Sequence, residues 1–261
     1  MRTFRVTLIG GIISYRALFH WVRPASFVGS LLAAPLFQLL FFVFLGRALG
    51  VADDRFYVLG NVILSATGAC IFGGAMGVAN ERVYGTLGHV LLSTCRRGAL
   101  WAGRSLPYAV NAVAVMVFTL ACATALLGVR MPVGSLAGLA AAMVVGSLSC
   151  TAFGIMIGAI GLRFRNVDTI ADAAMMLLVI ATGAEVPHSA LPIWLDGIGL
   201  FLPLTNAIDA ARGSVDGLAG SAVMIDVGRE VLVGVGYAGL AAVLLKYFEY
   251  RSRSGLSLDA V

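Results

Sequence analysis

The segment NERVYGTLGHVLLS, residues 80–93, places Glu81, Arg82 and His89 between two long apolar stretches. An adjacent carboxylate and guanidinium can form charge-assisted hydrogen bonds with a second protein. If the segment is helical, its apolar residues share one face: Val83, Leu87, Val90 and Leu91. We therefore expect an amphipathic helix parallel to a membrane surface, on which another protein could act.

The other residues that commonly do chemistry are isolated from one another. The three histidines, His20, His89 and His188, lie in separate segments and form no pair of metal ligands. The only lysine, Lys246, ends the last apolar stretch, and no phosphate-binding G-x-x-x-x-G-K-[ST] loop or G-x-S-x-G nucleophile motif occurs. The four cysteines form no C-x-x-C pair. We expect a chain that is not an enzyme and binds no cofactor itself.

The composition is that of a membrane protein. The chain has 261 residues, of which 60% are hydrophobic and 12% charged, against about 45–50% and about 25% in soluble domains. The apolar residues occur in runs close to the ~20 residues that cross a bilayer, and backbone groups in lipid must pair internally. The sequence therefore predicts an all-α membrane protein with six transmembrane helices, at residues 26–45, 56–79, 105–128, 136–162, 169–184 and 230–247.

The basic residues predict the orientation of these spans. Most of the 18 Lys and Arg residues flank alternate ends, in residues 1–24, 80–104, 163–165 and 246–253. Such clusters face the cytoplasm, so we expect a multi-pass protein of the cytoplasmic (inner) membrane with both termini inside. The net charge of +5 then needs no nucleic-acid partner.

Two further segments are expected to lie along the membrane. Residues 1–24 can form an interfacial helix whose polar side includes Arg5, Arg16 and Arg23. A basic leader that only sets the topology is the alternative. Residues 185–220 contain two short amphipathic stretches, separated by Pro203, that we expect to be re-entrant helices on the outer side. An ordinary external loop is the alternative there.

Within the spans, ionisable residues are few. Glu230 is expected near the outer start of the sixth span, where it can reach water. Gly154 and Gly158 form a G-x-x-x-G pattern that we expect to pack inside one bundle. Uncharged polar residues could line a substrate path or instead join helices by hydrogen bonds: Gln38, Asn61, Ser65, Thr67 and Asn111.

Two motifs give the chain a family resemblance. The residues of the first are Glu81, Arg82, Gly85, Thr86, Leu87, Arg96, Arg97 and Arg104. Their order, E-R-x-x-G-T-L, then a basic pair, then GRSLPY, resembles the cytoplasmic coupling segment of type-2 ABC exporter permeases; Arg104 stands where that family often has lysine. The second motif, LPIWLDGIGLFLPLTNAIDAARG, is similar to the outer pattern of the same family. With the six spans, the resemblance covers essentially the whole chain.

The resemblance implies a single transmembrane permease domain over residues 1–261, with a cytoplasmic coupling helix in residues 80–104. Two such subunits, as a homodimer or a heterodimer, would pair with two cytoplasmic ATPase subunits that hold ATP and Mg²⁺. Closure of the ATPases would move the coupling helix and the N-terminal helix and so alternate the path. The family's substrates include drugs and antibiotics, peptides, and lipid-linked glycans or polysaccharides.

A carrier or channel that works without a motor is the alternative function. Such a protein would need ionisable residues at mid-membrane or a repeated half. Neither feature is visible in the sequence.

Overall fold

The computed structural model describes residues 32–50, 53–83, 97–162 and 166–254, and every regular element in this part is helical. The elements are α3 (Ala34–Leu49), α4 (Asp54–Leu64), η2 (Gly68–Phe72), α5 (Gly73–Val83), α7 (Arg97–Leu127), η3 (Val133–Ser135), α8 (Leu136–Gly161), α9 (Val167–Ala181), η4 (His188–Ala190), α10 (Ile193–Gly199), α11 (Thr205–Val215) and α12 (Gly220–Ser254).

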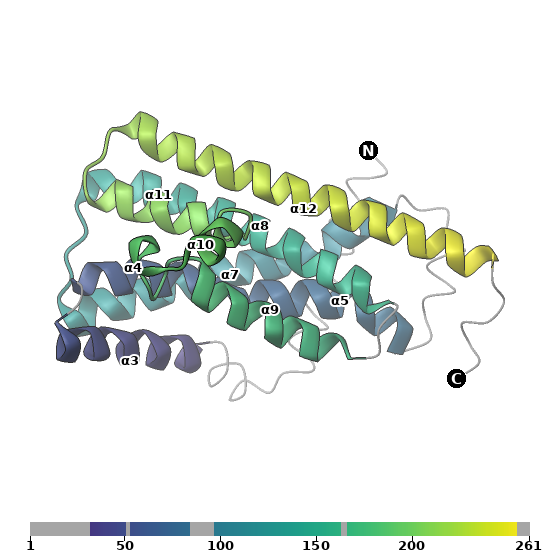
Figure 1. The fold of residues 1–261 in the computed structure, drawn as a ribbon, viewed down its shortest axis with the longest axis horizontal. Coiled ribbons are helices and arrows are strands. Elements are labelled where there is room, and N and C mark those ends of the chain that lie inside the picture. Colours follow the sequence, from purple (N-terminus) through teal and green to yellow (C-terminus); the bar gives the residue numbers. More distant parts are fainter. Residues whose placement is uncertain (1–31, 51–52, 84–96, 163–165, 255–261) are drawn as a thin grey trace.

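The helices form an elongated bundle in which α7, α8 and α12 run along the long axis (Figure 1). Four stretches are long and apolar enough to cross a membrane: Asp54–Val78, Gly103–Leu127, Val133–Gly161 and Gly220–Phe248. They correspond to the predicted second, third, fourth and sixth spans. The first three lie within a few residues of their predicted bounds, whereas the last begins at Gly220 and so extends the predicted span at its N-terminal end.

The prediction of six spans is confirmed only for these four. The first predicted span is represented by α3, of 16 residues, and residues 26–31 of that prediction lie outside the described part. The fifth predicted span is represented by α9, whose 15 residues rise about 22 Å, less than the ~30 Å of a hydrocarbon core. Figure 1 shows α9 ending partway along α8, with α11 continuing to the end of the bundle where α7 connects to α8. In place of one fifth helix of spanning length, the chain therefore has α9 followed by the turn at residues 182–187, η4, α10 and α11.

The second span is interrupted in its middle. Between α4 and α5 the chain forms a π-helical turn, η2, and the preceding hydroxyls bond to the local backbone. Ser65 Oγ donates to the Val62 carbonyl at 2.6 Å and Thr67 Oγ1 donates to the Leu64 carbonyl at 2.8 Å. These bonds satisfy hydroxyls that would otherwise be buried without partners.

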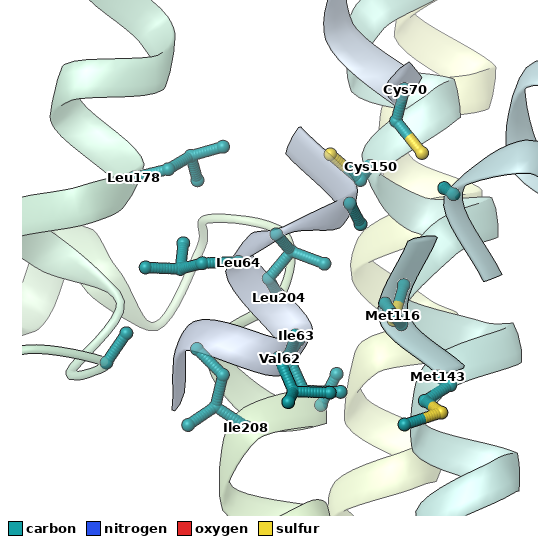
Figure 2. Close-up of a cluster of buried hydrophobic side chains, with 14 of the residues drawn as sticks. Val62, Ile63, Leu64, Cys70, Met116, Met143, Cys150, Leu178, Leu204 and Ile208 are labelled. Atoms are coloured by element: carbon teal, nitrogen blue, oxygen red, sulfur yellow. The ribbon is translucent and has the colours of Figure 1, made fainter. Parts of the chain in front are cut away.

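The second and fourth spans approach each other closely through glycine. A Cβ atom placed on Gly154 would lie 2.5 Å from the Cys70 carbonyl oxygen, and one on Gly158 would lie 2.7 Å from that of Ala75. The predicted G-x-x-x-G pair therefore packs inside the bundle, as expected. Figure 2 shows the adjoining core, in which Cys70 and Cys150 lie close together and Leu64, Leu204 and Ile208 fill the space toward α11.

Candidate functional site

The coupling residues predicted from the sequence are only partly covered by the structure. Helix α5 runs to Val83 and so includes the backbone of Glu81 and Arg82, and α7 begins at Arg97. The other predicted residues of this segment, Gly85, Thr86, Leu87 and Arg96, lie outside the described residues, as do Arg5, Arg16 and Arg23. Both helix ends lie at the same end of the bundle as the C-terminal end of α12 (Figure 1). The coupling role and the interfacial helix remain predictions.

Arg104 is the coupling residue whose side chain is described. It lies on α7, half-buried, with its guanidinium carbon 5.6 Å from the centre of the Trp101 ring. This distance permits a cation–π contact, which orients the side chain along the first turns of the helix.

The five polar residues predicted as a possible substrate path do not share one surface in the described chain. Asn61, Ser65 and Thr67 are buried on or just after α4, Asn111 is half-buried on α7, and Gln38 is exposed on α3. Gln38 and Asn61 are nevertheless brought together, because both side chains face the carboxyl group of Glu185. Whether any of the five meets substrate stays a prediction.

Glu185 follows α9 and is buried against α4, with 8% of its surface exposed. The Asn61 side-chain amide donates to Glu185 Oε2 at 3.3 Å and to the Tyr57 carbonyl at 3.0 Å. Glu185 Oε1 and Asn61 Oδ1 are both buried and have no hydrogen-bond partner. Burial raises the pKa of the Glu185 carboxyl from its usual 4.5 to about 7, against the opposing effects of Asn61, Gln38 and Arg212.

Arg212 of α11 holds the turn that precedes Glu185. Its guanidinium donates to the carbonyls of Gly183 at 2.9 Å, Ala184 at 3.0 Å and Phe56 at 3.2 Å. The same group stacks on the Phe56 ring, 3.7 Å from its centre. Burial lowers the pKa of Arg212 to about 10, so the side chain is a cation at neutral pH. The 183–184 turn and the start of α4, two segments distant in sequence, are thereby tied to α11 through one side chain.

The turn fits closely against α4 because of two glycines. Gly183 has a φ of +74°, a conformation that suits glycine, and a Cβ there would collide with the His188 ring. A Cβ on Gly60 would lie 2.5 Å from the Ala184 carbonyl oxygen. Backbone therefore packs on backbone at the point that Arg212 bridges.

Beside this turn, His188 links the two helices of the connection. Its Nδ1 lies 2.7 Å from Asp196 Oδ1 on α10, and its Nε2 lies 3.9 Å from Asp209 Oδ1 on α11. Burial raises the pKa of Asp209, against the opposing effects of His188 and Arg212. Within the described residues, no group of three His, Cys, Asp or Glu side chains is arranged to hold a metal ion.

Glu230 lies elsewhere than the sequence suggested. It was expected near the start of a span, but it lies well inside α12 and is completely buried. Its Oε1 accepts hydrogen bonds from the Ser149 hydroxyl on α8 and from the Leu204 backbone N–H at 2.8 Å. The expectation was wrong because α12 begins at Gly220, so Glu230 lies several turns inside the helix and not at its start.

Leu204 has a φ of +76°, and the Glu230 carboxyl lies at the N-terminal end of α11, where partial positive charge is concentrated. The carboxyl therefore joins α11 to both α8 and α12. The sequence held a signal for this contact, since an acidic residue within an apolar helix usually pairs with another polar group inside the bundle.

Comparison with known proteins agrees with the sequence motifs and with the helical architecture. The family model described as ABC-2 type transporter matches residues 11–215, a range that includes both the 80–104 segment and the α9–α11 connection. No curated protein matches the chain significantly. A match over most of the chain shows its family: the protein belongs to the ABC-2 type transporter family and is a multi-pass membrane permease component of an ABC transporter, which works with an ABC ATPase.

Proposed function

We propose that this permease is the membrane subunit of an exporter, in which two copies, or one copy and a related chain, form the path through the cytoplasmic membrane. Two ATPase subunits would bind ATP and Mg²⁺ and act on the 80–104 segment from the cytoplasm. The observation that carries the proposal is the family match over both predicted motifs, together with a sequence that lacks a phosphate-binding loop. The distribution of Lys and Arg supports the orientation.

The substrate class proposed is an amphiphilic or lipid-linked molecule: a drug or antibiotic, a peptide, or a lipid-linked glycan. Exposed apolar side chains on α3, on α10 and just after α10, among them Phe41, Trp194 and Phe201, are compatible with a permease that is bordered by lipid along its length. Such substrates can reach a path from the bilayer as well as from water.

The ATPase dependence can be tested with purified protein. The chain alone should hydrolyse no ATP above a blank, whereas co-expression with its cognate ATPase should give a stable complex with ATPase activity. Glu81→Ala and Glu81→Gln should weaken that complex or uncouple its activity, because the residue begins the proposed coupling segment. Asp216→Ala, an exposed change after α11, is the matched control and should leave both unchanged. Robust hydrolysis by the lone chain would refute the proposal.

The proposed orientation can be tested separately at Cys95. In intact cells whose chain retains this cysteine alone, an impermeant maleimide should not react with it. After permeabilisation it should react readily. Labelling in intact cells would place the segment outside and overturn the orientation.

One observation favours the alternative of a motor-independent carrier. Glu230 is a completely buried ionisable residue inside a helix of spanning length. Transport by proteoliposomes that contain this chain without any ATPase, and its loss in Glu230→Gln, would establish that alternative. The hydrogen bonds of Glu230 to Ser149 and Leu204 give the residue a structural role that fits the ABC permease equally well.

A further inference from the structure

The surroundings of Glu185 suit a protonated carboxyl better than a carboxylate. A carboxylate has only acceptor sites and, when buried, needs donors on both oxygens. Glu185 Oε2 has one long hydrogen bond, from Asn61, and the buried Oε1 has none. The groups that face it are Asn61 on α4, Gln38 on α3 and Arg212 on α11; Asp209, His188 and Asp196 lie in the cluster beyond Arg212.

Arg212 is the cation that favours the ionised form of the Glu185 carboxyl, yet its N–H groups donate their hydrogen bonds to other acceptors. The guanidinium bonds to the carbonyls of Gly183, Ala184 and Phe56, while its buried Nε has no partner. No ion pair joins Arg212 to Glu185 among the described residues. A negative charge on Glu185 would therefore compete with the three carbonyls for the same guanidinium, since a guanidinium binds a carboxylate, with both groups ionised, more strongly than it binds a neutral carbonyl.

We propose that Glu185 and Arg212 form a proton-controlled latch on the α9–α11 connection. With Glu185 protonated, Arg212 holds the 183–184 turn on α4. When the proton leaves to solvent, the carboxylate draws the guanidinium from the carbonyls or moves into water, and the turn is released. Residues 183–187 belong to no helix, so the turn can change its path without unwinding α9 or α11, and the hydrogen bonds of Arg212 to the Gly183 and Ala184 carbonyls are the contacts that hold it on α4.

The latch would give the connection a closed state under acidic conditions and a released state under alkaline ones. The pH at which the closed and released states are equally populated would lie near neutral, so small changes in pH shift the two populations. In the exporter proposed above, release of the α9–α11 connection would then depend on the pH of the medium that the turn faces. The inference concerns the lone chain, so it can fail while the proposed function stands.

Thr182 is a suitable reporter of release. It is completely buried at the end of α9, and its hydroxyl bonds only to the Leu178 carbonyl, so cysteine replaces it with little change in volume. We would purify full-length Thr182→Cys in detergent, with the four native cysteines replaced. A methanethiosulfonate reagent would be applied from about pH 6 to about pH 8, and each rate divided by that of free cysteine at the same pH.

The corrected rate should rise about tenfold over this range, because the ionised fraction of Glu185 rises from about one eleventh at pH 6 to about ten elevenths at pH 8 when the midpoint is near pH 7. Adding Glu185→Gln, which keeps the shape and cannot ionise, should hold the rate at its value near pH 6. Asp209→Asn is the matched control, since burial also raises the pKa of that carboxyl, and it should leave the rise intact.

A rise that persists in Glu185→Gln, or one that disappears in Asp209→Asn, would overturn the proposal, as would a flat rate in the parent. If Glu185→Gln does not fold, Arg212→Gln tests the other half of the latch. Its rate should be high at every pH, because the carbonyls have lost their donor. A pH step of parental size in Arg212→Gln would count against the latch.

Discussion

Replacing Glu230 tests whether a buried carboxyl holds α11 in the bundle. Glu230→Ala removes the acceptor for the Leu204 N–H and the Ser149 hydroxyl, and neither donor is at the surface. A buried donor left without a partner costs about 1–3 kcal/mol, and the lost side-chain volume adds a cavity. We expect a loss of about 3–5 kcal/mol in the free energy of unfolding.

Glu230→Gln should be much milder. The amide oxygen can still accept both hydrogen bonds, and only the charge at the N-terminal end of α11 is lost, an effect of about 0.3–2 kcal/mol. Removing a buried charge offsets part of that loss. Ser149→Ala, which deletes a single donor, should cost about 1 kcal/mol.

The assay is thermal unfolding of the purified chain in detergent, followed by tryptophan fluorescence. For a chain of this size, 1 kcal/mol corresponds to about 2–4 °C in Tm, so Glu230→Ala should unfold about 10 °C lower and Glu230→Gln within a few degrees of the parent. Hydrogen exchange adds a local reading, because the Leu204 amide should lose protection in the alanine variant alone. Equal Tm values for the parent and Glu230→Ala would refute this reasoning, as would a glutamine variant as unstable as the alanine variant.

Three further outcomes follow from other contacts. Arg212→Lys should lower Tm by several degrees, because one ammonium cannot reach three carbonyls and stack on a ring; a Tm equal to that of the parent would contradict this. Gly154→Ala should reduce the yield of folded protein, since its Cβ meets backbone at 2.5 Å, whereas Gly77→Ala, with open space, should be neutral; quantitative blots of membrane fractions compare them. The raised pKa of Glu185 stabilises the fold fully below about pH 4.5, and this contribution disappears as pH rises through about 7, so Tm should fall over that range in the parent and less in Glu185→Gln.

Much of the architecture was accessible from local sequence. The third and fourth spans were predicted within a few residues of Gly103–Leu127 and Val133–Gly161, because each is an uninterrupted apolar run of membrane length. The motifs in 80–104 and 191–213 pointed to the family that the comparison then showed. The Gly154 and Gly158 pair also predicted a close helix contact inside the bundle, since small residues at this spacing let backbones approach.

The length of α9 and the surroundings of the buried carboxyls depend on tertiary structure. Hydropathy over a window reports how apolar a stretch is, and it does not show where α9 ends or that α11 lies farther along the bundle. The surroundings of Glu185 and Arg212 also depend on contacts between segments that are distant in sequence. Asn61 meets Glu185 across 124 residues, and Arg212 reaches the Phe56 carbonyl across 156, so the partners that decide the protonation of Glu185 are not its neighbours in sequence. Composition and motifs are local properties, and they were enough to predict a helical membrane permease and its family. The positions of the buried charges could not be predicted in this way, because burial and hydrogen bonding depend on residues that folding brings together.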